Sequence, residues 1–299
     1  MSQNDHDTLQ HTLAGPAVFA GVGLHTGGRV RAAILPAPAG SGIVFLRTDV
    51  KGNGRIEALA GNVSNTRLST VIANGEGVTV ATVEHLMAAL YGLGVDNALV
   101  ELDGPEAPIM DGSAETFVRL IDRTGRRRQD APRQAIEILE PVEVIQGEKR
   151  AALVPCERFE IAVEIAFDSA AIGRQHIDMA VDEDSFRAGL SDCRTFGFLH
   201  EVEALRAAGL ARGGSLANAV VVDGDALMNP EGLRRADEFV RHKAVDAIGD
   251  LATLGHRLIG RYEGRLAGHA MNNALARALL ARPEAFQLRS LEPELAEAV

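Results

Sequence analysis

The sequence predicts an α+β protein built from two similar layers that face each other. Its 299 residues suit one large domain or two of about 150 residues. Both halves of the chain show the same order of elements, strands, a helix, a strand and a helix, although the residues themselves do not repeat. Because hydrophobic residues make up 46% of the chain, the two layers have enough apolar surface to bury a shared core.

The first half is predicted to hold two helices and a set of short strands. Apolar runs between glycine-rich turns predict the strands, and the dipeptide Asn74-Gly75 marks a hairpin turn. One helix is expected over residues 82–90, with Thr82 as a candidate N-cap, and a second over residues 113–124. The expected strands are residues 16–24, 29–35, 42–47, 70–73, 78–80 and 97–102.

A polar segment with a proline, residues 126–133, is the best candidate for a linker between the halves. It predicts a first domain at residues 1–127 and a second at residues 134–299. Within the second domain, residues 198–227 are expected to form an insert with a short helix, a glycine-rich turn and a strand. The remaining expected elements are strands at 136–144, 151–154, 159–167, 176–181 and 258–266, and helices at 236–254 and 272–280.

Composition excludes several classes of protein. The formal net charge of -11 argues against a general nucleic-acid binder, whose surface would be basic. Cys156 and Cys193 are the only cysteines and form no CxxC motif, so neither a disulfide framework nor a cysteine zinc site is expected. The polar N-terminus does not resemble a signal peptide, and no apolar run approaches the roughly 18 residues of a membrane span. We therefore expect a cytoplasmic protein without stable membrane insertion.

The stretch RHKAVDAIGD at residues 241–250 is the most informative part of the chain. As a helix, it places His242, Asp246 and Asp250 one turn apart on a single face. An imidazole and a carboxylate at this spacing can share one metal ion, whereas unpaired charge in a plain core would be costly. The spacing predicts half of a catalytic metal site, the alternative being a solvated face that pairs with neighbouring basic residues.

His85 is predicted to supply the other half of the site. Its helix occupies the matching place in the first half of the chain, and Glu84 precedes it. Three ligands, His85, His242 and Asp246, with one open position form the pattern of hydrolytic zinc. Glu84 is a carboxylate beside a ligand, so it is the candidate for the residue that takes a proton from the metal's water. The motif is neither HExxH nor its inverted form, and a lone helix histidine is more often structural.

Two further histidines stand in glycine-containing turns. Gly268-His269-Ala270 lies where a strand is expected to meet a helix, a common place for function and also for a plain turn. His25 lies in the loop GVGLHTG, which has the composition of a phosphate cradle but is a weak signal by itself.

Taken together, these segments resemble the UDP-3-O-acyl-N-acetylglucosamine deacetylase family, which acts at the committed step of lipid A biosynthesis. The resemblance implies two α+β domains, with helices sandwiched between two sheets and an insert in each domain. The matching segments cover both halves in family order: GVGLHTG at 21–27, TVEHLMAALYGLGVDNALVELDGPEAPIMDGSA at 82–114, RTFGF at 194–198, LRRADEFVRHKAVDAIGDL at 233–251 and GHAMNNAL at 268–275.

The resemblance also implies how the chemistry is divided among residues. A catalytic zinc is implied at His85, His242 and Asp246, with Glu84 as the general base. His269 matches a charged histidine that stabilises the oxyanion or protonates the leaving amine. The acid that orients this histidine matches Asp250, and a hydroxyl that helps to hold the tetrahedral intermediate matches Thr195.

The substrate implied by the resemblance is a nucleotide sugar that carries a fatty acyl chain. Lys243 matches a substrate-binding lysine, and Phe196 lies in a matching segment. The family often has a lysine three residues before the histidine that matches His269. This position is Leu266 here, so the neighbouring Arg265 is the expected basic contact. The insert is expected to line an acyl passage, or alternatively to pack only on itself, through Leu205, Leu210 and Leu216.

Two other functions fit the same residues. One is a metal-stabilised binding protein without catalysis, which would need a closed site with four ligands. The other is a zinc amidohydrolase that acts on a different acetylated sugar. Ferrous iron suits imidazole and carboxylate ligands as zinc does, so the ligand set leaves the metal open. We expect the protein to act as a monomer with no nucleic-acid partner.

Overall fold

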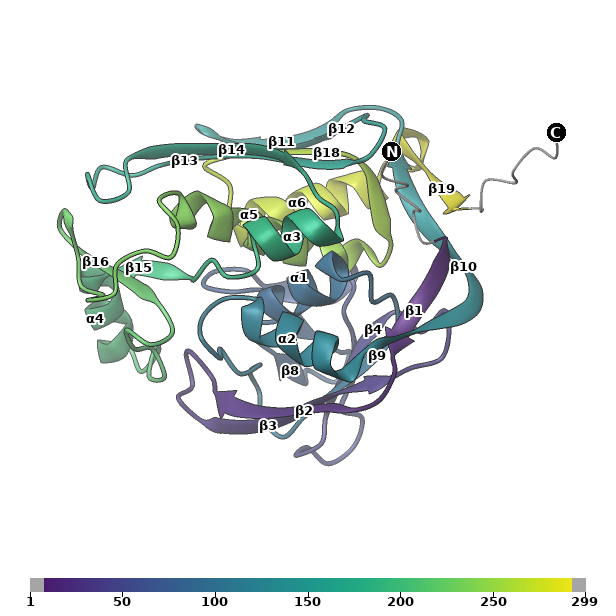
Figure 1. Cartoon of the computed structure of the whole chain (residues 1–299), viewed down its shortest axis with the longest axis horizontal. Coiled ribbons are helices and arrows are strands. Elements are labelled where there is room, and N and C mark those ends of the chain that lie inside the picture. Colours follow the sequence, from purple (N-terminus) through teal and green to yellow (C-terminus); the bar gives the residue numbers. More distant parts are fainter. Residues whose placement is uncertain (1–7, 292–299) are drawn as a thin grey trace.

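Two β-sheets enclose two layers of helices in the computed structural model, which describes residues 8–291. Helices α1 (Glu84–Gly92) and α2 (Glu115–Thr124) cover the first sheet. Helices α5 (Glu238–Leu251) and α6 (His269–Leu280) cover the second sheet and face the first pair (Figure 1). The predicted α+β fold with a β-α-α-β sandwich is therefore confirmed.

The first sheet turns one apolar face toward α1 and α2. On its central strands every second side chain is buried, as in Val30, Ala32 and Ile34. This alternation leaves charged neighbours such as Arg29 and Arg31 exposed. In spatial order the strands are β2 (Ala17–Val22), β3 (Arg29–Pro36), β9 (Ala98–Leu102), β4 (Ile43–Arg47) and β5 (Arg55–Glu57).

The second sheet is organised around β18 (Arg257–Arg265). This strand is antiparallel to β12 (Lys149–Val154) and parallel to β13 (Phe159–Ala166). Tyr262 on β18 is almost fully buried against the helices. The outer strands are β11 (Val142–Gln146), β14 (Arg174–Ala180) and β19 (Phe286–Leu291).

The segment expected to be a linker is a strand instead, so that prediction is wrong. β10 (Arg126–Ile138) pairs through its first residues with β1 (Leu9–Leu13) and through its last with β18 and β19. Its arginines are not merely solvated: Arg126 donates to the Leu93 carbonyl and Arg133 to the Gly94 carbonyl, at the end of α1. The expected division of the chain at residues 127–134 falls inside this strand and stays a prediction.

Several element boundaries differ from the sequence prediction for local reasons. Thr82 is not the N-cap of α1: its backbone has a φ of 57°, and its hydroxyl donates to Glu106 at 3.0 Å. The expected strand 136–144 is split at Pro141, whose nitrogen has no proton to donate to a sheet. Helix α3 (Glu183–Gly189) was not expected, although Asp182 and Ser185 form a capping box at its start.

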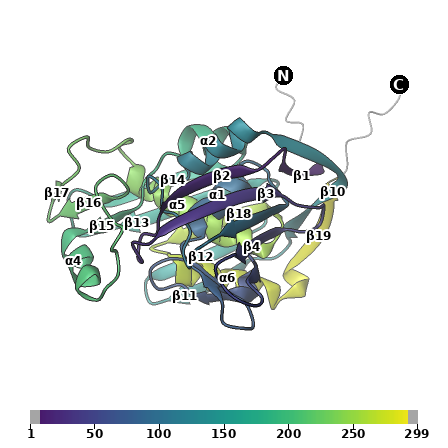
Figure 2. The same cartoon turned by 90° about the horizontal axis from the view of Figure 1, so that it is seen from below.

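Each half carries a small insert with its own sheet. The first insert pairs β6 (Val63–Asn65), β7 (Val71–Ala73) and β8 (Thr79–Val80). The second consists of β15 (Phe196–Phe198), α4 (Leu199–Ala207), β16 (Val220–Asp223) and β17 (Ala226–Leu227), and it projects from one end of the sandwich (Figure 2). Short 3-10 turns complete the fold at Ala60–Asn62, Ala252–Leu254 and Pro283–Ala285. Within residues 8–291, none of the helices has the length and apolar character needed to cross a bilayer.

Candidate active site

The two inner helices of the sandwich, α1 and α5, make an unusually close contact. A Cβ atom added at Gly249 of α5 would lie 2.0 Å from the Glu84 carbonyl oxygen of α1. Glycine is therefore needed at this position for steric reasons. The contact brings the first turn of α1, with Glu84 and His85, against the middle of α5.

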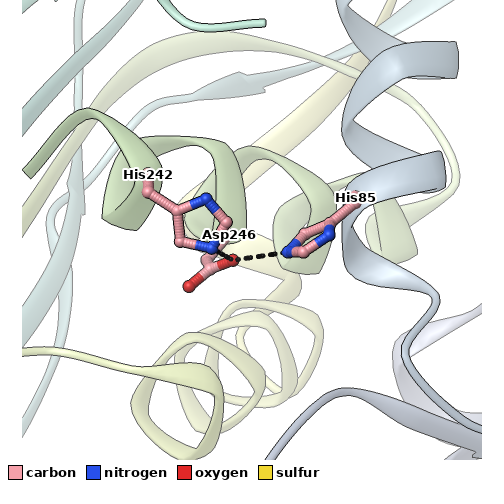
Figure 3. A group of neighbouring side chains, drawn as sticks. All are labelled: His85, His242 and Asp246. Carbon is pink, nitrogen blue, oxygen red and sulfur yellow. Dashed lines mark ion pairs between the residues drawn. The ribbon is translucent and has the colours of Figure 1, made fainter. Parts of the chain in front are cut away.

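His85, His242 and Asp246 converge in this contact (Figure 3), as expected from the spacing within α5 and from the matching place of α1 in the first half of the chain. One ligand atom from each residue lies within 4.8 Å of the other two. The His242 Nε2 atom is 3.2 Å from Asp246 Oδ1, and the His85 Nε2 atom is 3.6 Å from the same oxygen. Two atoms bonded at about 2.0 Å to a tetrahedral zinc lie roughly 3.3 Å apart, so these separations suit one ion.

The oxygen at the centre of this group has no donor of its own. Asp246 is only 3% exposed, and its Oδ1 atom is buried without a hydrogen-bond partner. Its Oδ2 atom accepts from Lys243 Nζ at 2.9 Å. Burial alone would raise the pKa of Asp246, but His242 and Lys243 hold it well below the usual value. An ionised, unsatisfied oxygen beside two imidazole nitrogens is the environment that a divalent cation completes.

Both histidines direct a ring nitrogen toward Asp246. Burial lowers the pKa of His85, which favours the unprotonated ring. The Nδ1 atom of His242 donates to the Cys193 carbonyl at 2.9 Å, so the free Nε2 atom faces Asp246. Fixing the second ring nitrogen in this way sets the tautomer that binds a metal.

Glu84 lies next to the three residues and is held by one backbone N–H, with His269 nearby. Its Oε2 atom accepts from the Thr70 backbone N–H at 3.0 Å, and its Oε1 atom is 4.0 Å from His269 Nε2. Burial raises the pKa of Glu84 to about 7, with Asp246 adding to the rise and His269 opposing it. A carboxylate with a pKa near neutrality can take up and release a proton at neutral pH.

His269 forms the opposite wall of the site and is held in its charged form. Its Nδ1 atom lies 2.9 Å from Asp250 Oδ2, and its Nε2 atom is 4.0 Å from Asp246 Oδ2. Burial alone would lower the pKa of His269, but the pairing with Asp250 raises it to about 10. Asp250 also accepts from the Thr70 hydroxyl and from Asn272 Nδ2. The group thus combines three residues that could hold a metal ion with a carboxyl group and an imidazole whose pKa values are both raised.

Comparisons with known proteins place this chain in a family. Residues 10–281 match the family model LpxC, described as UDP-3-O-acyl N-acetylglycosamine deacetylase. This chain belongs to that family. A relative from Phenylobacterium zucineum strain HLK1, named UDP-3-O-acyl-N-acetylglucosamine deacetylase, is 66% identical over 97% of this chain and 100% of its own length. Relatives with the same name from Myxococcus xanthus strain DK1622 and Geobacter sp. strain M21 are 48% and 46% identical, over 93% and 96% of this chain and 88% and 93% of their own lengths.

Family membership makes the chain a hydrolase that acts on an amide. It also accords with a metal-dependent reaction at the group of His85, His242 and Asp246. A metal-stabilised binding protein without catalysis does not fit a deacetylase family.

Lys243, Phe196 and Thr195 lie near the candidate metal group of the deacetylase. The Lys243 ammonium lies 5.4 Å from the centre of the Phe196 ring, which packs edge-on against Phe239 at 4.9 Å. The Thr195 backbone N–H donates to the Gly112 carbonyl at 2.8 Å, so this residue joins the two halves of the fold. Phe196 also lies edge-on to His242, with their ring centres 6.4 Å apart.

The remaining predicted substrate residues lie elsewhere in the deacetylase. Leu205 and Leu216 are half-buried in the second insert, and Leu210 is 37% exposed. Arg265 lies at the end of β18 on the solvent side of the sheet, where its Nε atom is 3.8 Å from Glu164. Successive residues of a strand face opposite sides of the sheet. Because Tyr262 and Gly264 face the helix layer, the Arg265 side chain points away from that layer.

The sequence interpretation missed the polar residues that support the deacetylase site from a distance. Thr70 contacts both Glu84 and Asp250, yet 180 residues separate Thr70 from Asp250 in the chain. No local pattern connects such residues. Asn272 had a signal, since it lies three residues after His269 on one helix face, and it accepts from the Tyr262 hydroxyl at 2.6 Å.

Proposed function

We propose that this deacetylase removes the N-acetyl group of UDP-3-O-acyl-N-acetylglucosamine and releases acetate, with zinc held by His85, His242 and Asp246. The names of the relatives support the substrate. The observation that carries the chemistry is the buried, donor-free Asp246 oxygen facing two imidazole nitrogens, with Glu84 and His269 beside it. A purely structural metal site has no need of this additional base and acid.

In this proposal Glu84 is the general base. Zinc, when bound, supplies Lewis acidity that polarises the acetamide carbonyl and eases deprotonation of a water. Glu84 Oε1 accepts the proton of the attacking water while Thr70 holds Oε2 in place. A base whose pKa lies close to neutrality combines a useful ionised fraction with a good affinity for the proton.

His269 and Thr195 would act on the intermediate and the leaving group. An amine leaves poorly unless it is protonated, and His269, kept charged by Asp250, carries a proton on Nε2 for this purpose. The Thr195 hydroxyl would donate to the oxyanion. Loss of one such donor costs about 10²–10³ in rate, so Thr195 should contribute without being indispensable.

Binding of the substrate is proposed to use the surfaces around this centre. Lys243 and Phe196 would contact the sugar beside His242, and Leu205, Leu210 and Leu216 would line the acyl chain in the second insert. Arg265 would serve the diphosphate only if its side chain left Glu164 and crossed the edge of the sheet. We further propose a cytoplasmic, monomeric enzyme with no nucleic-acid partner.

Acetate release from a synthetic acylated nucleotide sugar tests the proposal. Chelation should abolish the release, and added zinc should restore it. Glu84→Ala should keep zinc but lose most of its kcat, while Glu76→Ala, at an exposed glutamate, should match the wild type. Full activity of Glu84→Ala would remove Glu84 as the base. Equal activity on an unacylated nucleotide sugar would favour a different acetylated sugar as the substrate.

A further inference from the structure

The imidazole of His242 is held by a single peptide group, the one that joins Cys193 to Arg194. The carbonyl of this group accepts from His242 Nδ1 at 2.9 Å. Its N–H, which belongs to Arg194, donates to Glu238 Oε1 at 2.9 Å. In a trans peptide the C=O and N–H bonds point in opposite directions, so the two contacts hold the peptide from both sides.

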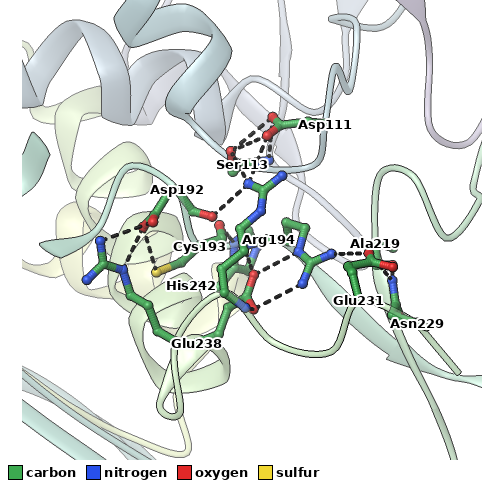
Figure 4. A network of polar contacts seen from close by, with 12 residues as sticks. Asp111, Ser113, Asp192, Cys193, Arg194, Ala219, Asn229, Glu231, Glu238 and His242 are labelled. Carbon is green, nitrogen blue, oxygen red and sulfur yellow. Dashed lines mark hydrogen bonds and ion pairs between the residues drawn. The ribbon is translucent and has the colours of Figure 1, made fainter. Parts of the chain in front are cut away.

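Glu238 and His242 are four residues apart on α5, so this peptide spans one turn of the helix. A chain of hydrogen bonds therefore runs outward from His242, the predicted metal ligand, through the peptide to Glu238 (Figure 4). Ligating histidines in metal sites usually donate their second ring nitrogen to a carboxylate or carbonyl. Here the carbonyl is itself fixed by a carboxylate, which links a residue remote from the metal to the orientation of the ligand.

The Glu238 carboxylate is itself held in place by several hydrogen bonds. It is fully buried, and Arg194 is only 2% exposed. Besides the Arg194 N–H, it accepts from Arg194 Nε at 2.9 Å, from Arg194 Nη2 at 3.2 Å and from the Arg234 N–H at 2.7 Å. A buried charge pair of this kind contributes little net stability compared with apolar residues, so its effect here is to fix the geometry of this segment rather than to add stability.

We propose that Glu238 and Arg194 are positioning residues for the metal centre. Together they orient the Cys193–Arg194 peptide, which selects the Nδ1–H tautomer of His242 and directs its Nε2 atom to the metal. The same segment continues into Thr195, whose backbone N–H donates to the Gly112 carbonyl. This inference rests on the proposed metal site and concerns residues outside it.

Zinc affinity of the metal-free protein provides the test, because it does not depend on turnover. Zinc is titrated against a chromophoric chelator, and the visible absorption of the Co²⁺-loaded protein reports the ligand geometry. Glu238→Gln replaces one carboxylate oxygen with an amide NH₂ group. This group is a donor and cannot accept the hydrogen bonds that Arg194 and Arg234 donate. The zinc Kd should therefore rise by about 10- to 100-fold, with an altered Co²⁺ spectrum.

Glu231→Gln is the matched control. Glu231 also pairs with Arg194, at 2.7 Å from Nη1, but its side chain is 53% exposed and it makes no contact with the peptide. Because exposed ion pairs contribute at most about 1 kcal/mol, the zinc Kd of this variant should change by no more than about fivefold. Its Co²⁺ spectrum should match that of the wild type.

The outcomes separate the inference from the proposed function. Failure of the wild type to bind zinc would sink the metal site itself. Tight zinc binding by the wild type together with an unchanged Kd and Co²⁺ spectrum in folded Glu238→Gln would overturn the positioning role alone. If Glu238→Gln does not fold, Arg194→Lys, which keeps the charge but loses the forked contact, is measured in the same way and should also bind zinc more weakly.

Discussion

Glu84 and His269 face each other across the metal ligands, and the protein gives them opposite protonation behaviour. Their nearest charged atoms are 4.0 Å apart. Burial raises the pKa of Glu84 to about 7, whereas the contact with Asp250 outweighs burial and raises the pKa of His269 to about 10. Between these values Glu84 is ionised and His269 is protonated, which is the combination that their proposed roles as base and acid require.

This pair predicts a bell-shaped dependence of kcat/KM on pH. Activity should fall as the pH drops through the pKa of Glu84, because a protonated carboxyl cannot accept a proton. It should also fall as the pH rises through the pKa of His269, because a neutral imidazole cannot donate one. A bound divalent cation adds positive charge beside both groups, so the limbs should lie at or below pH values of about 7 and about 10. Initial rates measured across this range check the shape.

Asp250→Asn identifies the residue responsible for the alkaline limb. The change removes the main interaction that raises the pKa of His269 and should move this limb to lower pH. The acid limb should move much less, since Asp250 is a minor cause of the raised pKa of Glu84. An alkaline limb that stays in place would mean that another group sets it.

Among the elements, the contact between α1 and α5 decides whether a site exists at all. The metal ligands of α5 could be found from the sequence because their spacing is local to one helix. Their partner His85 was found from the matching place of α1 in the first half of the chain. Neither observation reveals Gly249, whose absent side chain allows the two helices to meet.

Gly249→Ala tests the steric argument for this contact. Alanine normally stabilises a helix interior by about 1 kcal/mol relative to glycine, but here its Cβ would lie 2.0 Å from a backbone oxygen of α1. The helices must separate, so we expect a net loss of about 1–3 kcal/mol in the free energy of unfolding, together with lower acetate release. Gly61→Ala, where no atom lies within 4 Å, should leave both unchanged. A more stable Gly249→Ala variant would contradict this view of the contact.

Strands and supporting residues were harder to predict than the helices of the site. The polar sequence at the start of β10 predicts a linker, yet its pairing partners β1, β18 and β19 lie far away in the chain, so only the folded structure reveals the strand. Helix α3 was within reach of sequence analysis because Asp182 and Ser185 carry a capping-box pattern. Thr70 was not, because its contacts with Glu84 and Asp250 arise only when the first insert packs against α5.

For the molecule as a whole, a metal ion would join the two halves of the chain. His85 comes from the first half, and His242 and Asp246 come from the second. A ligand that binds only the folded state stabilises it by about 2.7 kcal/mol at a free concentration 100 times its Kd. Zinc should therefore raise the Tm of the metal-free protein in a concentration-dependent way.

Thermal unfolding with and without zinc measures this linkage. The rise in Tm should be largely lost in His85→Ala and retained in His200→Ala, which changes an exposed histidine of the second insert. An equal rise in all three proteins would show that zinc stabilises the fold from somewhere other than the group of His85, His242 and Asp246.

Strand β10 has a further consequence for how the first half of the chain is anchored. Its first residues pair with β1 and its last residues pair with β18 and β19, so these strands all belong to the second sheet. β1 comes shortly before β2 of the first sheet, and Thr12 of β1 also forms an isolated bridge with Asn97. The N-terminal strand therefore fastens the first half of the chain to the sheet of the second half.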